Sequence, residues 1–205
     1  MDYLIAMVIF AITTSVTPGP NNILVMSSGV NFGSKRSLPL LTGICVGFAL
    51  MIFLVGVGLG QVFAWFPVLH TIIKALGSLY LLYLAWLIMT SSGIGDSSAQ
   101  SEPLTFFKGA LFQWVNAKAW VVATGAIAAF GAVGSSAISQ NLLLCSIFLV
   151  VAFPCVGVWL LFGVALKKYL TLDRYRRWFN FSMGGLLALS VMPVLYELIQ
   201  EFDIL

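Results

Sequence analysis

The stretch TPGPNN at residues 17–22 lies near the middle of an apolar run that extends from Tyr3 to about Val30. About 20 apolar residues are enough to cross a bilayer as a helix. Both prolines in the stretch lack a backbone N–H, so a helix through it leaves the carbonyls of Thr14 and Val16 without their usual partners. Free backbone groups at membrane depth are tolerated only where protein or a water-filled cavity covers them. The sequence therefore predicts a membrane helix that is broken near its centre.

The predicted break collects several polar groups at one depth in the membrane. Gly19 removes any steric reason to stay helical. Asn21 and Asn22 follow where a second half-helix would begin, with N–H groups free of intrahelical partners and a positive dipole end. Transporters bind zwitterions and ions with this combination of groups. We predict a substrate site here; the alternative is a proline kink that helix packing absorbs.

The composition is that of a chain solvated by lipid. Of the 205 residues, 60% are hydrophobic and only 8% are charged, against about 25% in a soluble domain. Six membrane spans would use most of the length, which predicts a single transmembrane transporter domain over residues 1–205. The net charge of +3 comes from loops, so we expect the lipid bilayer, and no nucleic acid, as a partner. The start Met1-Asp2 lacks a basic region, so the first run is expected to be a span and not a signal peptide.

The apolar runs predict an all-α integral membrane protein with six transmembrane helices. The runs are Tyr3–Val30, Leu38–Phe63, Thr71–Met89, Phe106–Phe130, Leu142–Leu166 and Phe179–Ile199. Loops one, three and five carry the basic residues Lys35, Arg36, Lys108, Lys167, Lys168, Arg174, Arg176 and Arg177. On the other side are only His70 and Lys74. Because basic loops stay in the cytoplasm, both termini are predicted to lie outside it.

Six spans with both ends outside can divide into two inverted halves of three, about residues 1–92 and 104–205. The first span of each half has a polar interruption near its middle, at residues 17–22 and at Gln113–Lys118. Paired broken helices 1 and 4 point to a binding site at mid-membrane depth. Gly43 and Gly47 in the second span form a small-xxx-small pair, which is typical of close helix packing, with a gate as the alternative.

Four segments together are similar to the LysE/RhtB family of bacterial amino-acid exporters. They are TPGPNN at residues 17–22, Gly43–Phe48, Leu76–Leu81, and Phe107–Gly109 leading to Asn116–Lys118. The resemblance implies a small, multi-pass protein of the bacterial cell inner membrane that exports amino acids and derivatives, usually by proton antiport. The run Pro18–Ser28 looks closest to the branch that exports cysteine and O-acetylserine.

One position departs from the family pattern. The family commonly has Asn-Pro-Lys in the fourth span, and this chain has Ala117 in place of the proline. On an unbroken helix, Asn116 and Lys118 would point about 200° apart and could not share a site. Either the helix unwinds here without a proline, or only one of the two side chains faces the cavity.

The predicted site suits a small neutral amino acid or derivative in its zwitterionic form. It offers amides, hydroxyls and backbone groups, and no Asp or Glu near the centre of any run to pair a cationic side chain. Lys118 lies near the centre of its run, so the substrate carboxylate is its natural counter-ion, and protons are the expected coupling ion. The alternative is an interfacial anchor. The candidate substrate-binding residues are Thr17, Pro18, Gly19, Pro20, Asn21, Asn22, Gln113, Asn116 and Lys118.

Two other functions are weighed against export of an amino acid. Cys45 and Cys155 occupy corresponding spans of the two halves, which suggests a thiol relay that passes reducing equivalents across the membrane. Buried cysteines, however, are ordinarily inert. A divalent-metal exporter needs several carboxylates, which the spans do not supply, so no metal and no cofactor is expected. No nucleophile and base can be assembled into a catalytic set, so we expect a transporter and not an enzyme. The sequence leaves a homo-oligomer open.

Overall fold

The computed structural model describes residues 2–59, 65, 67–91, 102–132 and 134–203, and throughout this part every regular element is a helix. The α-helices are α1 (Asp2–Val16), α2 (Pro20–Leu54), α4 (Pro67–Met89), α5 (Phe106–Phe112), α6 (Ala117–Phe130), α7 (Ala137–Lys167), α8 (Asp173–Leu189) and α9 (Met192–Asp203). Short helical turns cover Val55–Leu59 (η1), Gln113–Val115 (η2) and Gly134–Ser136 (η3). The predicted all-α class is confirmed for these residues. The side chains of His70 and Lys74, and Gly60, lie outside the described part.

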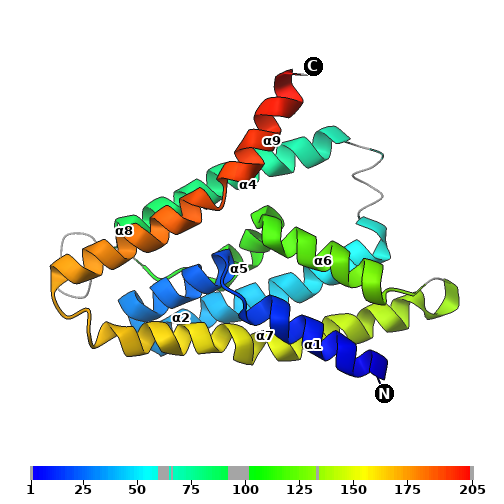
Figure 1. The fold of residues 1–205 in the computed structure, drawn as a ribbon, viewed down its shortest axis with the longest axis horizontal. Coiled ribbons are helices and arrows are strands. Elements are labelled where there is room, and N and C mark those ends of the chain that lie inside the picture. Colours follow the sequence, from blue (N-terminus) through cyan, green and yellow to red (C-terminus); the bar gives the residue numbers. More distant parts are fainter. Residues whose placement is uncertain (1, 60–64, 66, 92–101, 133, 204–205) are drawn as a thin grey trace.

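Helix α2 is a helical hairpin folded at Gly33. The backbone of Gly33 has φ 78° and ψ 175°. Glycine adopts this conformation readily, whereas a residue with a side chain would be strained in it. The hydroxyls of Ser28 and Ser37 are 2.7 Å apart, although nine residues of straight helix would separate them by about 13.5 Å. The chain therefore reverses, and the two arms of α2 lie side by side (Figure 1). We call residues 20–32 the first arm and residues 34–54 the second arm. The basic loop predicted here is reduced to a turn at one glycine.

Four helical segments of the described chain are long and apolar enough to cross a membrane: Pro20–Gly58, Thr71–Met89, Ala137–Lys167 and Asp173–Gln200. The first of them contains both arms of the α2 hairpin. Helices α1 and α6 are apolar but have only 15 and 14 residues, which is too short for a crossing on their own. A multi-pass membrane architecture follows, whereas the count of six spans and the inverted repeat remain predictions.

The helices form two groups in the bundle. Helix α2 packs on α7 and α5, α1 packs on α7, and α4 pairs with α8 on the other side of α5 (Figure 1). Close contacts are made by small residues. A Cβ added to Gly43 would lie 2.0 Å from the carbonyl oxygen of Phe106, and one added to Gly47 would lie 2.6 Å from Ala110 Cα. Both predicted packing glycines thus face α5, where the helix backbones approach closely.

In the part of the chain that the structure describes, the interior holds two clusters of buried apolar side chains. We call the larger one the inner cluster; it includes Leu24, Ile44 and Leu84 and joins α2, α4, α7 and α8. The other, the outer cluster, is centred on Phe148, whose ring contacts those of Phe48 and Phe10 at centroid distances of 5.5 and 6.2 Å. These edge-to-face contacts tie α7 to α2 and α1.

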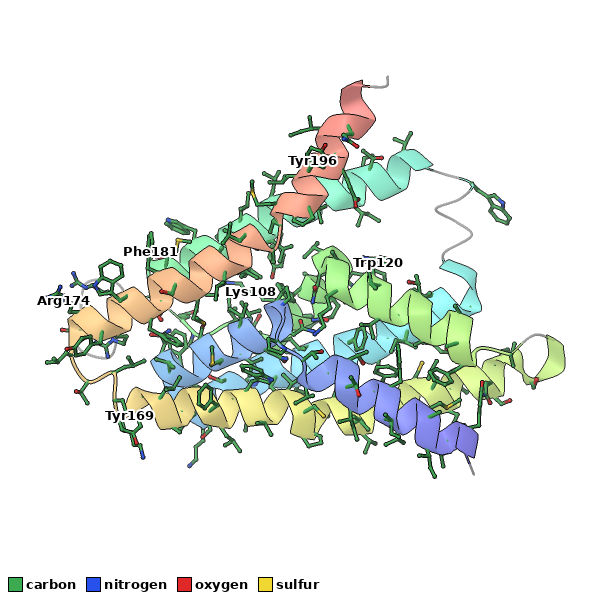
Figure 2. All side chains as sticks on the ribbon, viewed as in Figure 1. Lys108, Trp120, Tyr169, Arg174, Phe181 and Tyr196 are labelled. Carbon is green, nitrogen blue, oxygen red and sulfur yellow. The ribbon has the colours of Figure 1, made fainter. Side chains whose placement is uncertain are left out.

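Apolar side chains also cover the outside of the bundle. Leu79, Val121 and Val150 are 65 to 71% exposed, on three different helices. Such surfaces suit lipid as the solvent. The basic segment after α7 lies at one end of the molecule, with Tyr169 and Arg174 far from the N-terminal end of α1 (Figures 1 and 2).

Candidate functional site

The first helix is interrupted between α1 and α2, where the sequence predicts a break. Gly19 is fully extended at the start of α2, with φ −177° and ψ −179°. The carbonyls left free by the break are taken by side chains. Asn22 Nδ2 donates to Ser15 O (3.1 Å) and Thr17 O (2.8 Å), and Trp159 Nε1 donates to Val16 O (3.0 Å). The break is thus stabilised by groups from α2 and α7, and the Val16 carbonyl predicted to be free has an indole partner.

The predicted fourth span is also interrupted, between α5 and α6, although Ala117 stands where the family commonly has a proline. Helix α5 ends at Phe112, a tight turn follows, and Asn116 is extended with φ −86° and ψ 104°. The Asn116 side-chain oxygen accepts a hydrogen bond from the N–H of Lys118 (3.2 Å), which caps the N-terminus of α6. In other family members a proline, which lacks an N–H, would end the helix here. In this chain the Asn116 side chain stabilises the break by capping the start of α6. Of the two alternatives, the helix unwinds, and both Asn116 and Lys118 reach the same cavity.

The two breaks meet through Lys118. Its Nζ donates to Thr17 O (2.8 Å) and Thr17 Oγ1 (3.0 Å), with Pro18 O at 3.4 Å. The side chain passes over Gly19, where an added Cβ would lie 2.9 Å from Lys118 Cδ. Within the described part of the chain no carboxylate pairs with Lys118. The ammonium group therefore rests on the carbonyl oxygens of the other break.

Side-chain amides form a second connection between the breaks. Asn21 and Gln113 are paired reciprocally, each donating to the other's oxygen at 3.0 Å. Asn116 Nδ2 donates to Asn21 Oδ1 (3.3 Å), and Gln113 Nε2 also donates to Gly109 O (3.1 Å). Gln113 is completely buried and is not part of the cavity lining; its amide holds the side chain of Asn21 in position.

Asn22 carries an acceptor without a partner. The residue is 2% exposed, and its Oδ1 accepts no hydrogen bond from any residue that the structure describes. A buried acceptor left unpaired costs about 1–3 kcal/mol. Asn22 lines the cavity, so a ligand N–H could recover that energy if the cavity widened enough to expose this oxygen.

These groups surround a cavity of about 40 Å³, which holds only a few water molecules. Of the predicted residues, the lining includes Gly19, Asn21, Asn22, Asn116 and Lys118. Outside the lining, Thr17 is bonded to Lys118 and Gln113 is bonded to Asn21, while Pro18 and Pro20 lie at the break itself. The cavity lies between the two apolar clusters, because Ile44 and Val156 of the inner cluster and Phe48 and Val122 of the outer cluster also line it.

Some lining residues were not predicted. Thr14 and Ser15 are polar residues directly before the break, a signal that could have identified them. Ala152 and Val156 on α7 line the cavity, and Trp159 reaches the break, but all three lie in an unbroken apolar run without any pattern to mark them. Cys45 also borders the cavity; it, Cys145 and Cys155 are buried free thiols.

The amino-acid sequence matches the LysE type translocator family over residues 12–197. The chain belongs to this family. The translocator is similar to the cysteine/O-acetylserine efflux proteins of Salmonella typhimurium (strain LT2) and Escherichia coli (strain K12), each 33% identical over 122 residues. The aligned part covers 59% of this chain and 62%, less than two thirds, of each relative. No solved structure matches the translocator. Its family and its long apolar helices make it a multi-pass membrane protein.

Proposed function

We propose that this translocator exports a small neutral amino acid or derivative, in its zwitterionic form, across the bacterial inner membrane by proton antiport. The observation that carries the proposal is the position of Lys118 between two helix breaks, bonded only to carbonyl and hydroxyl oxygens among the described residues. A lysine at membrane depth is usually functional. The carboxylate of the substrate is the counter-ion that the surrounding protein does not provide.

The two ends of a zwitterion match different parts of the site. Lys118 Nζ and the N-terminus of α2 attract the carboxylate. The α-ammonium group needs acceptors, and the unpaired Asn22 Oδ1 and the carbonyl of Thr17 supply them. When a carboxylate takes Lys118, the Thr17 and Pro18 carbonyls that held it are released toward the ammonium group. Binding would thus exchange one set of contacts for another without leaving a buried charge alone.

The small size of the cavity and its position between two apolar clusters fit alternating access. Separation of the inner cluster would open the site to one side of the membrane, and separation of the outer cluster would open it to the other. We propose that the basic segments face the cytoplasm and both termini face the periplasm, in accordance with the distribution of Lys and Arg. Lys118 is the candidate for linking substrate binding to proton movement.

The proposal is tested by overproducing the translocator in bacterial cells and measuring amino acids in the medium. We expect one or more of cysteine, O-acetylserine, homoserine, threonine and leucine to accumulate, and no accumulation with Lys118→Gln. Release of lysine or arginine alone would contradict the assigned substrate class. In inside-out membrane vesicles, a protonophore should abolish accumulation of the same amino acid. Accumulation that survives the protonophore would exclude proton antiport.

The thiol relay is the alternative with a structural observation in its favour, since Cys45 borders the cavity. A variant in which Cys45, Cys145 and Cys155 are all replaced by alanine separates the two functions. We expect this variant to export the amino acid normally, because no thiol takes part in the proposed binding. Loss of export, with normal protein level, would favour the relay.

A further inference from the structure

A second cavity lies at the other end of the first arm of α2. Its volume is about 320 Å³, against about 40 Å³ for the site between the breaks. It is bordered by Ser27, Ser28 and Asn31 of the first arm, and by Glu102 and Lys108 on either side of the start of α5. We call this cavity the vestibule. It is large enough for a small amino acid.

The vestibule contains an unused buried hydroxyl. Ser27 is 1% exposed, and its Oγ has no hydrogen-bond partner within the described ranges. Its neighbours are occupied: Ser28 is bonded to Ser37, and Asn31 forms a reciprocal amide pair with Asn180 at 2.9 and 3.0 Å. A buried hydroxyl normally has a hydrogen-bond partner. Ser27 Oγ therefore keeps a hydrogen-bonding capacity that no described residue uses, and a ligand could reach it if the vestibule widened slightly.

The vestibule also carries one charge of each sign. Among the described residues that line it, Glu102 is acidic and Lys108 is basic. Lys108 lies between the α2 hairpin and the layer of α4 and α8 (Figure 2), and its carbonyl accepts a hydrogen bond from the hydroxyl of Tyr80 at 3.0 Å. A zwitterion satisfies both charges at once, whereas a simple cation or anion satisfies only one. The rest of the wall is mostly apolar and includes Leu24, Ile88 and Leu104, with Ser91 as a further polar residue.

The vestibule and the site between the breaks share the first arm. On α2, Asn22 borders the site and Ser27 borders the vestibule, which places them about 7.5 Å apart along the helix. Leu24, a member of the inner cluster, lies between these two residues in the chain. The Asn21–Gln113 pair connects the start of α2 to the residue that follows α5. A substrate could pass from one cavity to the other when this pair and the inner cluster separate.

We propose that the vestibule is a second binding site for the exported zwitterion, at which substrate is captured from the cytoplasmic side before it reaches Lys118. Glu102 binds the α-ammonium group, Lys108 binds the carboxylate, and Ser27 Oγ adds a hydrogen bond. This inference rests on the proposed function and on the predicted cytoplasmic position of the basic loops. It assigns the vestibule to loading, and the site between the helix breaks to the transport step.

The first test measures uptake of labelled O-acetyl-L-serine into inside-out membrane vesicles, whose outer face is the cytoplasmic face. Glu102→Gln and Lys108→Gln should each raise the half-saturation concentration about tenfold or more, with the maximal rate close to that of the unmodified protein. Lys35→Gln is the matched control, because it removes a basic residue outside the vestibule; its half-saturation concentration should not change. If both vestibule variants behave as the unmodified protein while Lys118→Gln abolishes uptake, the proposed function stands and the vestibule site is wrong. If the unmodified vesicles take up none of the neutral amino acids, both proposals are wrong.

The second test detects occupancy of the vestibule directly. Ser27→Cys is introduced into the variant that lacks the three native cysteines, and the new thiol is labelled with N-ethylmaleimide from the cytoplasmic face. O-acetyl-L-serine should slow labelling at least several-fold, and this protection should persist when Lys118→Gln is added. Protection that disappears with Lys118→Gln, or a thiol that does not react from this face, would overturn the vestibule site.

Discussion

At the scale of single residues, Lys118 is the group that we propose binds the substrate carboxylate. Its Nζ lies within hydrogen-bond distance of the Thr17 carbonyl and hydroxyl, 2.8 and 3.0 Å away. Carbonyl dipoles stabilise an ammonium group without neutralising it, so the site keeps a positive charge to offer. An Asp or Glu in the same place would neutralise Lys118 and would remove its reason to bind a carboxylate.

Replacement of Lys118 should separate the proposed function from an anchoring role. A hydrogen bond to a charged group contributes about 1.5–3 kcal/mol, which corresponds to a change of roughly 10- to 150-fold. We expect Lys118→Gln and Lys118→Ala to lower export at least about tenfold while the amount of protein in the membrane stays normal. Export rates in cells and immunoblots of the membrane fraction measure the two quantities. Export by Lys118→Gln at the unmodified rate would remove Lys118 from the mechanism.

Gly19 should be required for the position of Lys118 and not for the fold. Its extended backbone is open to any residue, but an added Cβ would lie 2.9 Å from Lys118 Cδ and 3.1 Å from Nζ. We expect Gly19→Ala to displace the ammonium group and to reduce export about 10- to 100-fold, as small misplacements of functional groups do. Gly125→Ala on α6 is the control, because an added Cβ there meets no described atom within 4 Å. Equal export by the two variants would refute the positioning role.

At the scale of helices, the two breaks arise from different causes. The first could be predicted from the chain because two prolines remove N–H groups from one turn. The second could be located by its polar residues, but whether the helix opens there depends on the Asn116 side chain capping α6, and that contact is visible only in three dimensions. The fold of α2 at Gly33 is similar: the basic residues predict a turn, and the backbone conformation of one glycine makes it.

Removal of the first break should preserve the protein and close the site. Pro18→Ala with Pro20→Ala restores two N–H groups, which can bond the carbonyls of Thr14 and Val16. The straightened helix would withdraw the carbonyls that hold Lys118. We expect a thermal unfolding midpoint in detergent at or above that of the unmodified protein, together with loss of export. Full export by the double variant would show that the break is only a kink.

At the scale of the whole molecule, the long apolar helices and the positions of the basic loops could be predicted, but the contacts between helices could not. The central part of α7 is apolar on every side, so the sequence does not show that Ala152 and Val156 face the cavity while Val150 faces outward. Pairing of distant helices decides which side of an apolar run is buried. Nor does the pattern reveal the vestibule, whose lining comes from three separate segments.

The proposed orientation gives a prediction for the ends of the chain. A reporter enzyme that is active only in the periplasm, fused after Leu205, should be active. The same reporter inserted after Lys168, in the basic segment between α7 and α8, should be silent. The opposite pattern of activities would reverse the orientation and would place the vestibule on the periplasmic side.

The indole of Trp159 gives the first break an intrinsic fluorescent reporter. Its Nε1 is bonded to Val16 O at 3.0 Å, so straightening of the break would break this contact and change the polarity around the ring. With the other five of the six tryptophans replaced by phenylalanine, the emission maximum of Trp159 should shift on addition of a transported amino acid. The shift should be absent in the double proline variant, in which Val16 O is already bonded within the helix. An unchanged spectrum in the active protein would mean that the first break does not change its conformation when substrate binds.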